Sequence, residues 1–194
     1  MTRILKVIIL LAAMGTLLVS TSAAQARGVV GIGIGVPVGD FADATGGAAE
    51  PGGGTALVGL EWLPTGSTYG LRIDGAYNRF CTTVCDDAQG ELDVRYRLFN
   101  FNLNGIVELP LVGTSLRPYA LAGAGLYNYK LEGDDVAATA GDSQTDLGLN
   151  GGLGLTMTMG RVGVFAEGRF HNVFVEGSDL QYIPIVLGAR IGLQ

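Results

Sequence analysis

Apolar residues alternate with polar or small residues along almost the whole chain after residue 28. In the stretch GVVGIGIGVPVG (Gly28–Gly39), for example, valine or isoleucine occupies every second position and mostly glycine stands between them. A period of two residues is typical of β-strands, because successive side chains of a strand point to opposite faces. Eight such stretches can be identified, and the pattern therefore predicts an all-β protein. They are Val29–Val38, Thr55–Leu63, Thr68–Phe80, Glu91–Leu109, Ser115–Leu131, Asp146–Met159, Arg161–Val175 and Gln181–Leu193.

The spaced glycines of the first stretch also invite comparison with a nucleotide-binding loop. That fingerprint requires the spacing G-x-G-x-x-G between a strand and a helix. Here the spacing differs, and Pro37, Gly39 and Asp40 follow where the helix should begin. The glycines are better explained as the small-residue face of a strand.

Each predicted strand has one apolar face and one face of small or polar residues. In the fourth stretch the first half, LDVRYRL (Leu92–Leu98), is out of phase with the second half, so we expect a β-bulge near Leu98. In the fifth stretch we expect the larger residues on the apolar face and mainly alanines on the other. The two expected sets are Tyr119, Leu121, Tyr127 and Tyr129 against Ala120, Ala122, Ala124 and Asn128.

The connections between the predicted strands alternate in length. The short ones are Pro64–Ser67, Pro110–Thr114 and a turn at Gly160, and the longer ones are Gly39–Gly54, Cys81–Gly90, Glu132–Thr145 and Glu176–Leu180. This alternation predicts an up-and-down antiparallel barrel in which every second connection lies on the same rim. It is typical of outer-membrane barrels, which have short periplasmic turns and longer outer loops.

The composition of the non-apolar faces indicates which way those faces point. A surface in water is usually rich in Lys and Glu, whereas these faces are rich in Gly, Ala, Asn and Thr, and Lys130 is the only lysine after residue 26. Small residues suit the narrow interior of a barrel of about eight strands. We therefore expect the apolar faces to contact lipid and a set of paired charges to fill the lumen. This predicted lumen network consists of Glu61, Arg72, Asp74, Glu108, Glu167, Arg169 and Arg190.

Three aromatic residues fall near the ends of their predicted strands. Trp62 lies near a short turn, and Tyr127 and Tyr129 lie near a long loop. Aromatic girdles of membrane barrels occur at these two levels. We expect these three side chains to belong to the girdles.

The first 26 residues have the features of a secretory signal peptide. Arg3 and Lys6 precede the apolar run Val7–Val19, and the small-x-small sequence Ala24–Ala26 forms a cleavage site. The apolar run is shorter than the roughly 20 residues of a membrane-spanning helix. We therefore divide the chain into a signal peptide, residues 1–26, and a barrel domain, residues 27–194.

Charge and cysteine content narrow the possible functions further. Without Arg3 and Lys6 the chain has ten basic and 18 acidic residues, a net charge of −8. This balance argues against nucleic-acid binding, which depends on Lys and Arg. Cys81 and Cys85 are the only cysteines, and in an exported protein we expect them to form a local disulfide rather than a metal site.

Taken together, these features resemble the small eight-stranded outer-membrane β-barrels of the OmpA/OmpX type. The resemblance rests on the signal peptide, the eight alternating strands, the loop pattern and the terminal YIPIVLGARIGLQ. It implies a bacterial outer-membrane location, contact with outer-membrane lipids, and insertion by the barrel-assembly machinery, and we expect a monomer. The chain ends in Leu193 and Gln194, where family members commonly end in an aromatic residue.

The sequence favours a structural or surface-interaction role, with acidic loops presented outside the cell. A narrow pore for small solutes and a soluble lipocalin-like carrier are the alternatives. A further hypothesis is weak binding of divalent cations at the loops, since carboxylates suit calcium or magnesium. The loop acids are Asp40, Asp43, Glu50, Asp86, Asp87, Glu132, Asp134, Asp135, Asp142, Glu176 and Asp179.

We expect no cofactor and no catalysis. His171 is the only histidine, and the sequence HNV places no serine beside it. Nucleophilic catalysis needs a nucleophile within hydrogen-bond reach of a base. We therefore expect His171 to be an interior or rim residue that pairs with a neighbour.

Overall fold

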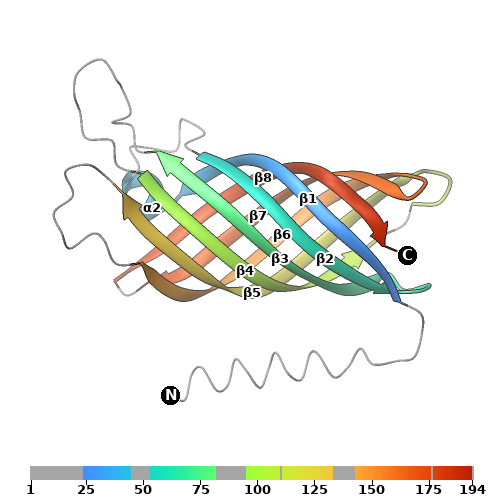
Figure 1. Cartoon of the computed structure of the whole chain (residues 1–194), viewed down its shortest axis with the longest axis horizontal. Helices are drawn as coiled ribbons and strands as arrows, with labels where there is room; N and C mark the ends of the chain where they lie inside the picture. Colours follow the sequence, from blue (N-terminus) through green and yellow to red (C-terminus); the bar gives the residue numbers. More distant parts are fainter. Residues whose placement is uncertain are drawn as a thin grey trace, which may run out of the picture.

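The chain folds into a closed antiparallel β-barrel (Figure 1). The computed structural model describes residues 24–44, 53–81, 95–109, 111–132, 143–175 and 177–193. Consecutive strands pair in chain order, and β1 pairs with β8 to close the barrel. The elements are β1 (Ala24–Val38), α2 (Asp40–Ala44), β2 (Gly53–Pro64), β3 (Tyr69–Cys81), β4 (Arg95–Glu108), β5 (Leu116–Glu132), β6 (Gln144–Met159), β7 (Val162–Val175) and β8 (Ser178–Leu193).

Closure of the barrel gives each strand two neighbours. The β1–β8 pairing runs from Ala26 opposite Leu193 to Val38 opposite Gln181, so the first and last strands pair over most of their length. In lipid an unpaired backbone N–H or C=O group costs several kcal/mol, at about the level of an unmade hydrogen bond in hydrocarbon. A barrel without sheet edges removes that cost.

The branched apolar side chains lie on the outside of the barrel. Ile32 is 73% exposed, Leu153 71% and Ile185 47%. On the opposite face of the sheet, charged and amide side chains such as Glu61, Arg72 and Asn102 are 0% exposed and lie in the lumen. This arrangement confirms the predicted orientation of β1, β6 and β8 and rules out a soluble lipocalin-like carrier, whose apolar faces would meet in the interior.

The predicted orientation of β5 is wrong. Tyr119, Leu121 and Tyr127 are buried in the lumen, whereas Ala120 and Ala122 are exposed on the outside. The error has a physical cause: the lumen is not uniformly polar, so a strand can carry large side chains on its inner face. Tyr127 and Tyr129, which also points inward, therefore cannot belong to an outer aromatic girdle.

The predicted β-bulge near Leu98 is absent. The pairing of β4 with β3 and with β5 is continuous through Arg97, Leu98 and Phe99. Tyr96 and Leu98 pack inward with other apolar residues near the loop end of the barrel, while Arg97 and Phe99 face outward. The alternation shifts in the sequence because the lumen face of β4 changes from apolar residues to asparagines along the strand. The pairing register does not change.

The last predicted connection, Glu176–Leu180, is also wrong. Only residues 176–177 separate β7 from β8, and Gly177 has a φ of 95°. Glycine adopts this left-handed conformation without steric cost, which allows a tight turn. Asp179 therefore lies in β8 opposite Phe174 instead of in a loop.

A short helix, α2, which the sequence pattern does not predict, follows β1. It contacts β1 and β8 at the barrel end opposite to the end of β8 (Figure 1). Its Phe41 is buried against Phe80 and Tyr96. Among the described residues no helix has the length and apolar character needed to span a membrane.

Two predictions fall wholly or partly outside the described residues. Residues 1–23 of the predicted signal peptide are not described, and β1 begins at Ala24, three residues before the expected start of the barrel domain. Cys81 is the last residue of β3, and Cys85 is not described. The signal peptide and the disulfide stay predictions.

We predict that Ile32→Arg destabilises the folded barrel by about 2–4 kcal/mol, because it places a charge on the lipid face near the middle of β1. Reversible urea unfolding in lipid vesicles measures this change. Ile32→Val, which keeps the side chain apolar, is the matched control. A loss no larger than that of the control would contradict the outward orientation.

Candidate functional site: a charged lumen with an aromatic cap

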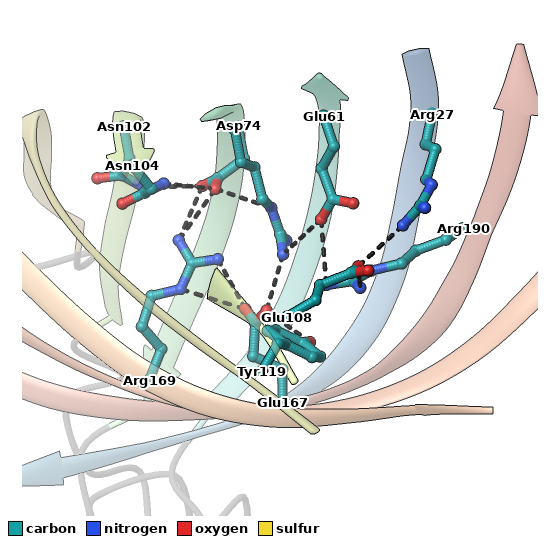
Figure 2. A network of polar contacts seen from close by, with 11 residues as sticks. Arg27, Glu61, Asp74, Asn102, Asn104, Glu108, Tyr119, Glu167, Arg169 and Arg190 are labelled. Carbon is teal, nitrogen blue, oxygen red and sulfur yellow. Dashed lines mark hydrogen bonds and ion pairs between the residues drawn. The ribbon is translucent and has the colours of Figure 1, made fainter. Parts of the chain in front are cut away.

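Two arginines and two carboxylates form the centre of the lumen (Figure 2). Arg169 on β7 bonds to both Oδ atoms of Asp74 on β3, at 3.0 and 3.1 Å, and to Glu167 Oε1 at 2.6 Å. Arg72 Nη1 lies 2.7 Å from Glu167 Oε2, and Arg72 Nε lies 3.1 Å from Asp74 Oδ2. Each arginine thus contacts both carboxylates, and the group ties β3 to β7 across the barrel.

A second group continues from this centre toward the short-turn end. Glu61 Oε1 lies 3.5 Å from Arg72 and 3.1 Å from Arg190. Arg190 Nη1 lies 2.9 Å from Glu108 Oε1, which also accepts a hydrogen bond from Arg27 at 2.8 Å. Strands β1, β2, β4 and β8 therefore join the network through one continuous chain of ion pairs.

Asparagine amides complete the hydrogen bonding of Asp74. Asn102 and Asn104 on β4 donate to its two carboxylate oxygens at 3.0 and 2.9 Å. Further toward the loops, Asn78 donates to Asn100 at 2.9 Å. A buried carboxylate needs hydrogen-bond donors for both its oxygens, and these two amides supply them without adding a further charge.

Aromatic residues support the network from inside the barrel. The Tyr119 hydroxyl donates to Glu167 Oε2 at 2.8 Å, and the Arg190 guanidinium lies 4.0 Å from the centroid of the Tyr119 ring. Gly154 on β6 stands opposite Tyr119, and a Cβ at that position would collide with the tyrosine ring. The small residues of the lumen face therefore make room for the larger side chains of other strands.

In the interior of the barrel the charges of the network balance. Four carboxylates, Glu61, Asp74, Glu108 and Glu167, face four arginines, Arg27, Arg72, Arg169 and Arg190. A fifth arginine, Arg117, is 43% exposed at the rim and lies 3.8 Å from Glu108 Oε2. Removing one member of such a buried set leaves an uncompensated charge, which is strongly destabilising. The network thus stabilises one arrangement of the strands and fills the lumen.

Apolar and aromatic side chains fill the lumen near its loop end, and we refer to this set as the cap. Ring contacts join Phe80 to Phe41 and to Tyr182, with centroids 5.2 and 5.5 Å apart. This set leaves the loop end of the described lumen occupied by close-packed side chains. The cap consists of Phe41, Phe80, Leu98, Tyr127, Val173, Leu180 and Tyr182.

His171 lies beneath the cap and is fully enclosed. Its Nδ1 is hydrogen-bonded to the Tyr127 hydroxyl at 2.8 Å, and its ring stacks on Tyr182 with centroids 4.6 Å apart. These contacts are those of a structural side chain in the lumen. No serine or cysteine is hydrogen-bonded to it among the described contacts.

At the opposite end the lumen opens into a cavity of about 610 Å³. Arg27 and Arg190 belong to both this cavity and the ion-pair network, and Arg117 and Arg161 line its rim. The cavity ends where the side chains of the network fill the barrel. In the described part of the chain no group of His, Cys, Asp and Glu side chains could hold a metal ion.

All seven residues of the predicted lumen network lie inside the barrel, and every one takes part in an ion pair. Sequence reasoning missed several participants, among them Arg27, Tyr119 and Phe165, whose ring lies 5.5 Å from the Arg190 guanidinium. Alternation with Val30 and Ile32 could have placed Arg27 inside. For Tyr119 and Phe165 the sequence carries no signal that distinguishes a lumen aromatic from a lipid-facing one.

The family-model comparison identifies the protein class. The model of the outer membrane protein beta-barrel domain matches residues 9–189. The chain belongs to this family. Its location is therefore the bacterial outer membrane, with the lipid-facing surface described above. Comparison with curated protein sequences finds no match.

Solved structures with the same fold include three small outer-membrane proteins. Neisserial surface protein A has a TM-score of 0.64 at 15% identity, with 89% of this chain and 100% of that chain covered. Ail of Yersinia pestis, solved with the heparin analogue sucrose octasulfate, has a TM-score of 0.58 at 13% identity, with 88% and 99% covered. The N-terminal barrel of Pseudomonas aeruginosa OprF has a TM-score of 0.51 at 14% identity, with 89% and 98% covered. At these identities the likeness shows the fold alone.

We predict that Glu167→Gln lowers the stability of the barrel by about 3–5 kcal/mol, because it leaves two buried arginines with too little negative charge. Urea unfolding in lipid vesicles gives the difference from the unmodified protein. Asp179→Asn, at an exposed position outside the network, is the control and should cost at most about 1 kcal/mol. Equal losses for the two variants would show that the network adds nothing specific.

Proposed function

We propose that the barrel is a non-conducting membrane anchor that presents its loop end for interactions at the cell surface. The observation that supports this proposal is the filled lumen. The ion-pair network occupies its centre, and the cap occupies its loop end. Because the lumen is filled, contacts with partners are made by the loops and by the outer surface of the barrel.

A narrow pore is the second candidate, and two observations favour it. The cavity at the short-turn end leads into the lumen, and several buried polar atoms of the lumen, such as Arg72 Nη2 and Thr156 Oγ1, have no hydrogen-bond partner among the described residues. Such atoms suit bound water. The cap opposes conduction, because its rings pack against one another and leave apolar surface in the path.

Planar-bilayer recordings test these two candidates. We predict that the purified protein gives no resolved unitary conductance, because ion pairs and packed rings fill the lumen. The double variant Phe80→Ala/Tyr182→Ala, which removes the centre of the cap, shows whether the assay detects an opened lumen. Reproducible conductance steps of the unmodified protein would overturn the anchor proposal and favour the pore.

The chemistry of the loops suggests a cationic partner. The predicted loop segments Gly39–Gly54, Cys81–Gly90 and Glu132–Thr145 contain acidic residues but no Lys or Arg. Complementary charge steers association and selects partners. A polyanion such as the heparin analogue bound to Ail would meet repulsion at these segments. We propose that the protein acts as a monomer and without catalysis, and that divalent cations bind these loops only weakly.

We predict that the protein in phosphatidylcholine vesicles binds a fluorescent oligolysine peptide with an affinity that falls as salt is added. The variant Asp86→Asn/Asp87→Asn/Asp134→Asn/Asp135→Asn should lose most of this binding. The control Thr82→Ala/Thr83→Ala changes neighbouring neutral residues of a loop segment. Unchanged binding by the Asp-to-Asn variant, or preferential binding of sucrose octasulfate, would contradict a cation-selective loop surface.

A further inference from the structure

Three basic side chains stand side by side on the outer surface of the barrel. Arg79 on β3 pairs in register with Arg97 on β4, and Arg97 pairs with Lys130 on β5. All three face outward, because their neighbours Phe80, Leu98 and Tyr129 face the lumen. Adjacent strands lie about 4.8 Å apart, so the basic row extends about 10 Å across the wall.

The basic row lies at a defined level of the barrel. Each of its residues is two positions from the loop end of its strand, since β3 ends at Cys81, β4 begins at Arg95 and β5 ends at Glu132. In an outer-membrane barrel this end faces away from the periplasm. The row includes Lys130, which is the only lysine after residue 26 of this acidic chain.

An apolar groove of about 580 Å³ adjoins the row on its membrane side. Ala56, Val58 and Gly75 form its floor, where small side chains leave the wall hollow, and Phe99 and Phe101 border it. Tyr77 and Phe99, whose ring centroids are 4.8 Å apart, pair in register two positions from Arg79 and Arg97. The groove and the row are therefore continuous along β3 and β4.

Polar contacts lie between the apolar groove and the basic row. Asn128 on β5 donates to Thr145 Oγ1 on β6 at 2.8 Å, and both residues line the groove one outward position below Lys130. Arg79 Nε is shielded from solvent and has no hydrogen-bond partner among the described residues. This nitrogen donates to no described neighbour, so the Arg79 guanidinium can turn toward an anionic oxygen bound at the row.

We propose that this surface binds a phosphorylated acyl lipid of the outer leaflet, with its phosphate on the basic row and an acyl chain in the groove. Arg and Lys are the usual ligands of phosphate oxygens, and basic side chains near a membrane surface attract anionic headgroups. The aliphatic and aromatic side chains that line the groove suit contact with a hydrocarbon chain. A free phosphate ion would use the row and leave the groove empty, which distinguishes the lipid from its headgroup alone.

Native mass spectrometry of the detergent-solubilised protein tests the site. We expect dioleoyl phosphatidic acid to bind more tightly than dioleoyl phosphatidylcholine. The variant Arg79→Gln/Arg97→Gln/Lys130→Gln should bind phosphatidic acid at least about tenfold more weakly. Arg161→Gln, which removes a cation at the opposite end of the barrel, should bind it like the unmodified protein.

A groove-filling variant tests the acyl chain separately. A Cβ added at Gly75 meets only the Asn100 carbonyl oxygen at 3.6 Å, so a side chain can start at this position without a backbone clash, and Gly75→Leu places it in the groove. We expect this variant to lose binding of phosphatidic acid severalfold while its heat-modifiable migration on a detergent gel is unchanged.

Three results would overturn the proposal. Equal affinity for the two lipids would remove the role of the phosphate, and unchanged binding by the triple variant would remove the role of the basic row. Full displacement by millimolar inorganic phosphate, with Gly75→Leu binding phosphatidic acid normally, would indicate a simple anion site and exclude the lipid.

Discussion

The structure depends on one constraint: a β-sheet surrounded by hydrocarbon must satisfy its backbone hydrogen bonds within itself. The pairing of β1 with β8 meets this constraint by closing the sheet. Closure at eight strands then sets the width of the lumen, which admits side chains but little else. Every strand therefore presents one row of side chains to lipid and the other to a crowded interior.

The crowded interior explains the unusual composition of the inner faces. Arginines, tyrosines and phenylalanines project from some strands, and glycines on neighbouring strands leave space for them. Gly154 opposite Tyr119 shows this exchange of volume directly, because no side chain fits beside that ring. Gly125 does the same for Asn102, which a Cβ at position 125 would strike. Charge balance and complementary volume together produce a lumen that holds the strands in one register.

Sequence alternation predicts the strands, the closure and the outward aliphatic face because all three follow from the period of two residues and from the lipid environment. It also places the charged residues of the network, since Arg72 and Asp74 alternate with apolar neighbours such as Leu71 and Ile73. The same reasoning fails for β5 and for the first half of β4. These segments carry aromatic and aliphatic side chains on their lumen face, and a sequence cannot show whether Tyr127 or Leu98 contacts lipid or the cap. The partners of each ion pair depend on contacts between strands far apart in the chain, as for Arg72 and Glu167, and no local pattern encodes them.

The most direct measurement of the central claim compares methyl groups on the two faces of the same strands. In lipid nanodiscs that contain a spin label on the acyl chains, paramagnetic relaxation is measured for Val29 and Val30 on β1 and for Val186 and Leu187 on β8. Val30 and Leu187 are exposed on the outside, and Val29 and Val186 are buried in the lumen. The account predicts strong relaxation of Val30 and Leu187 methyl groups and weak relaxation of Val29 and Val186. The reverse pattern, or equal relaxation of both members of each pair, would contradict it.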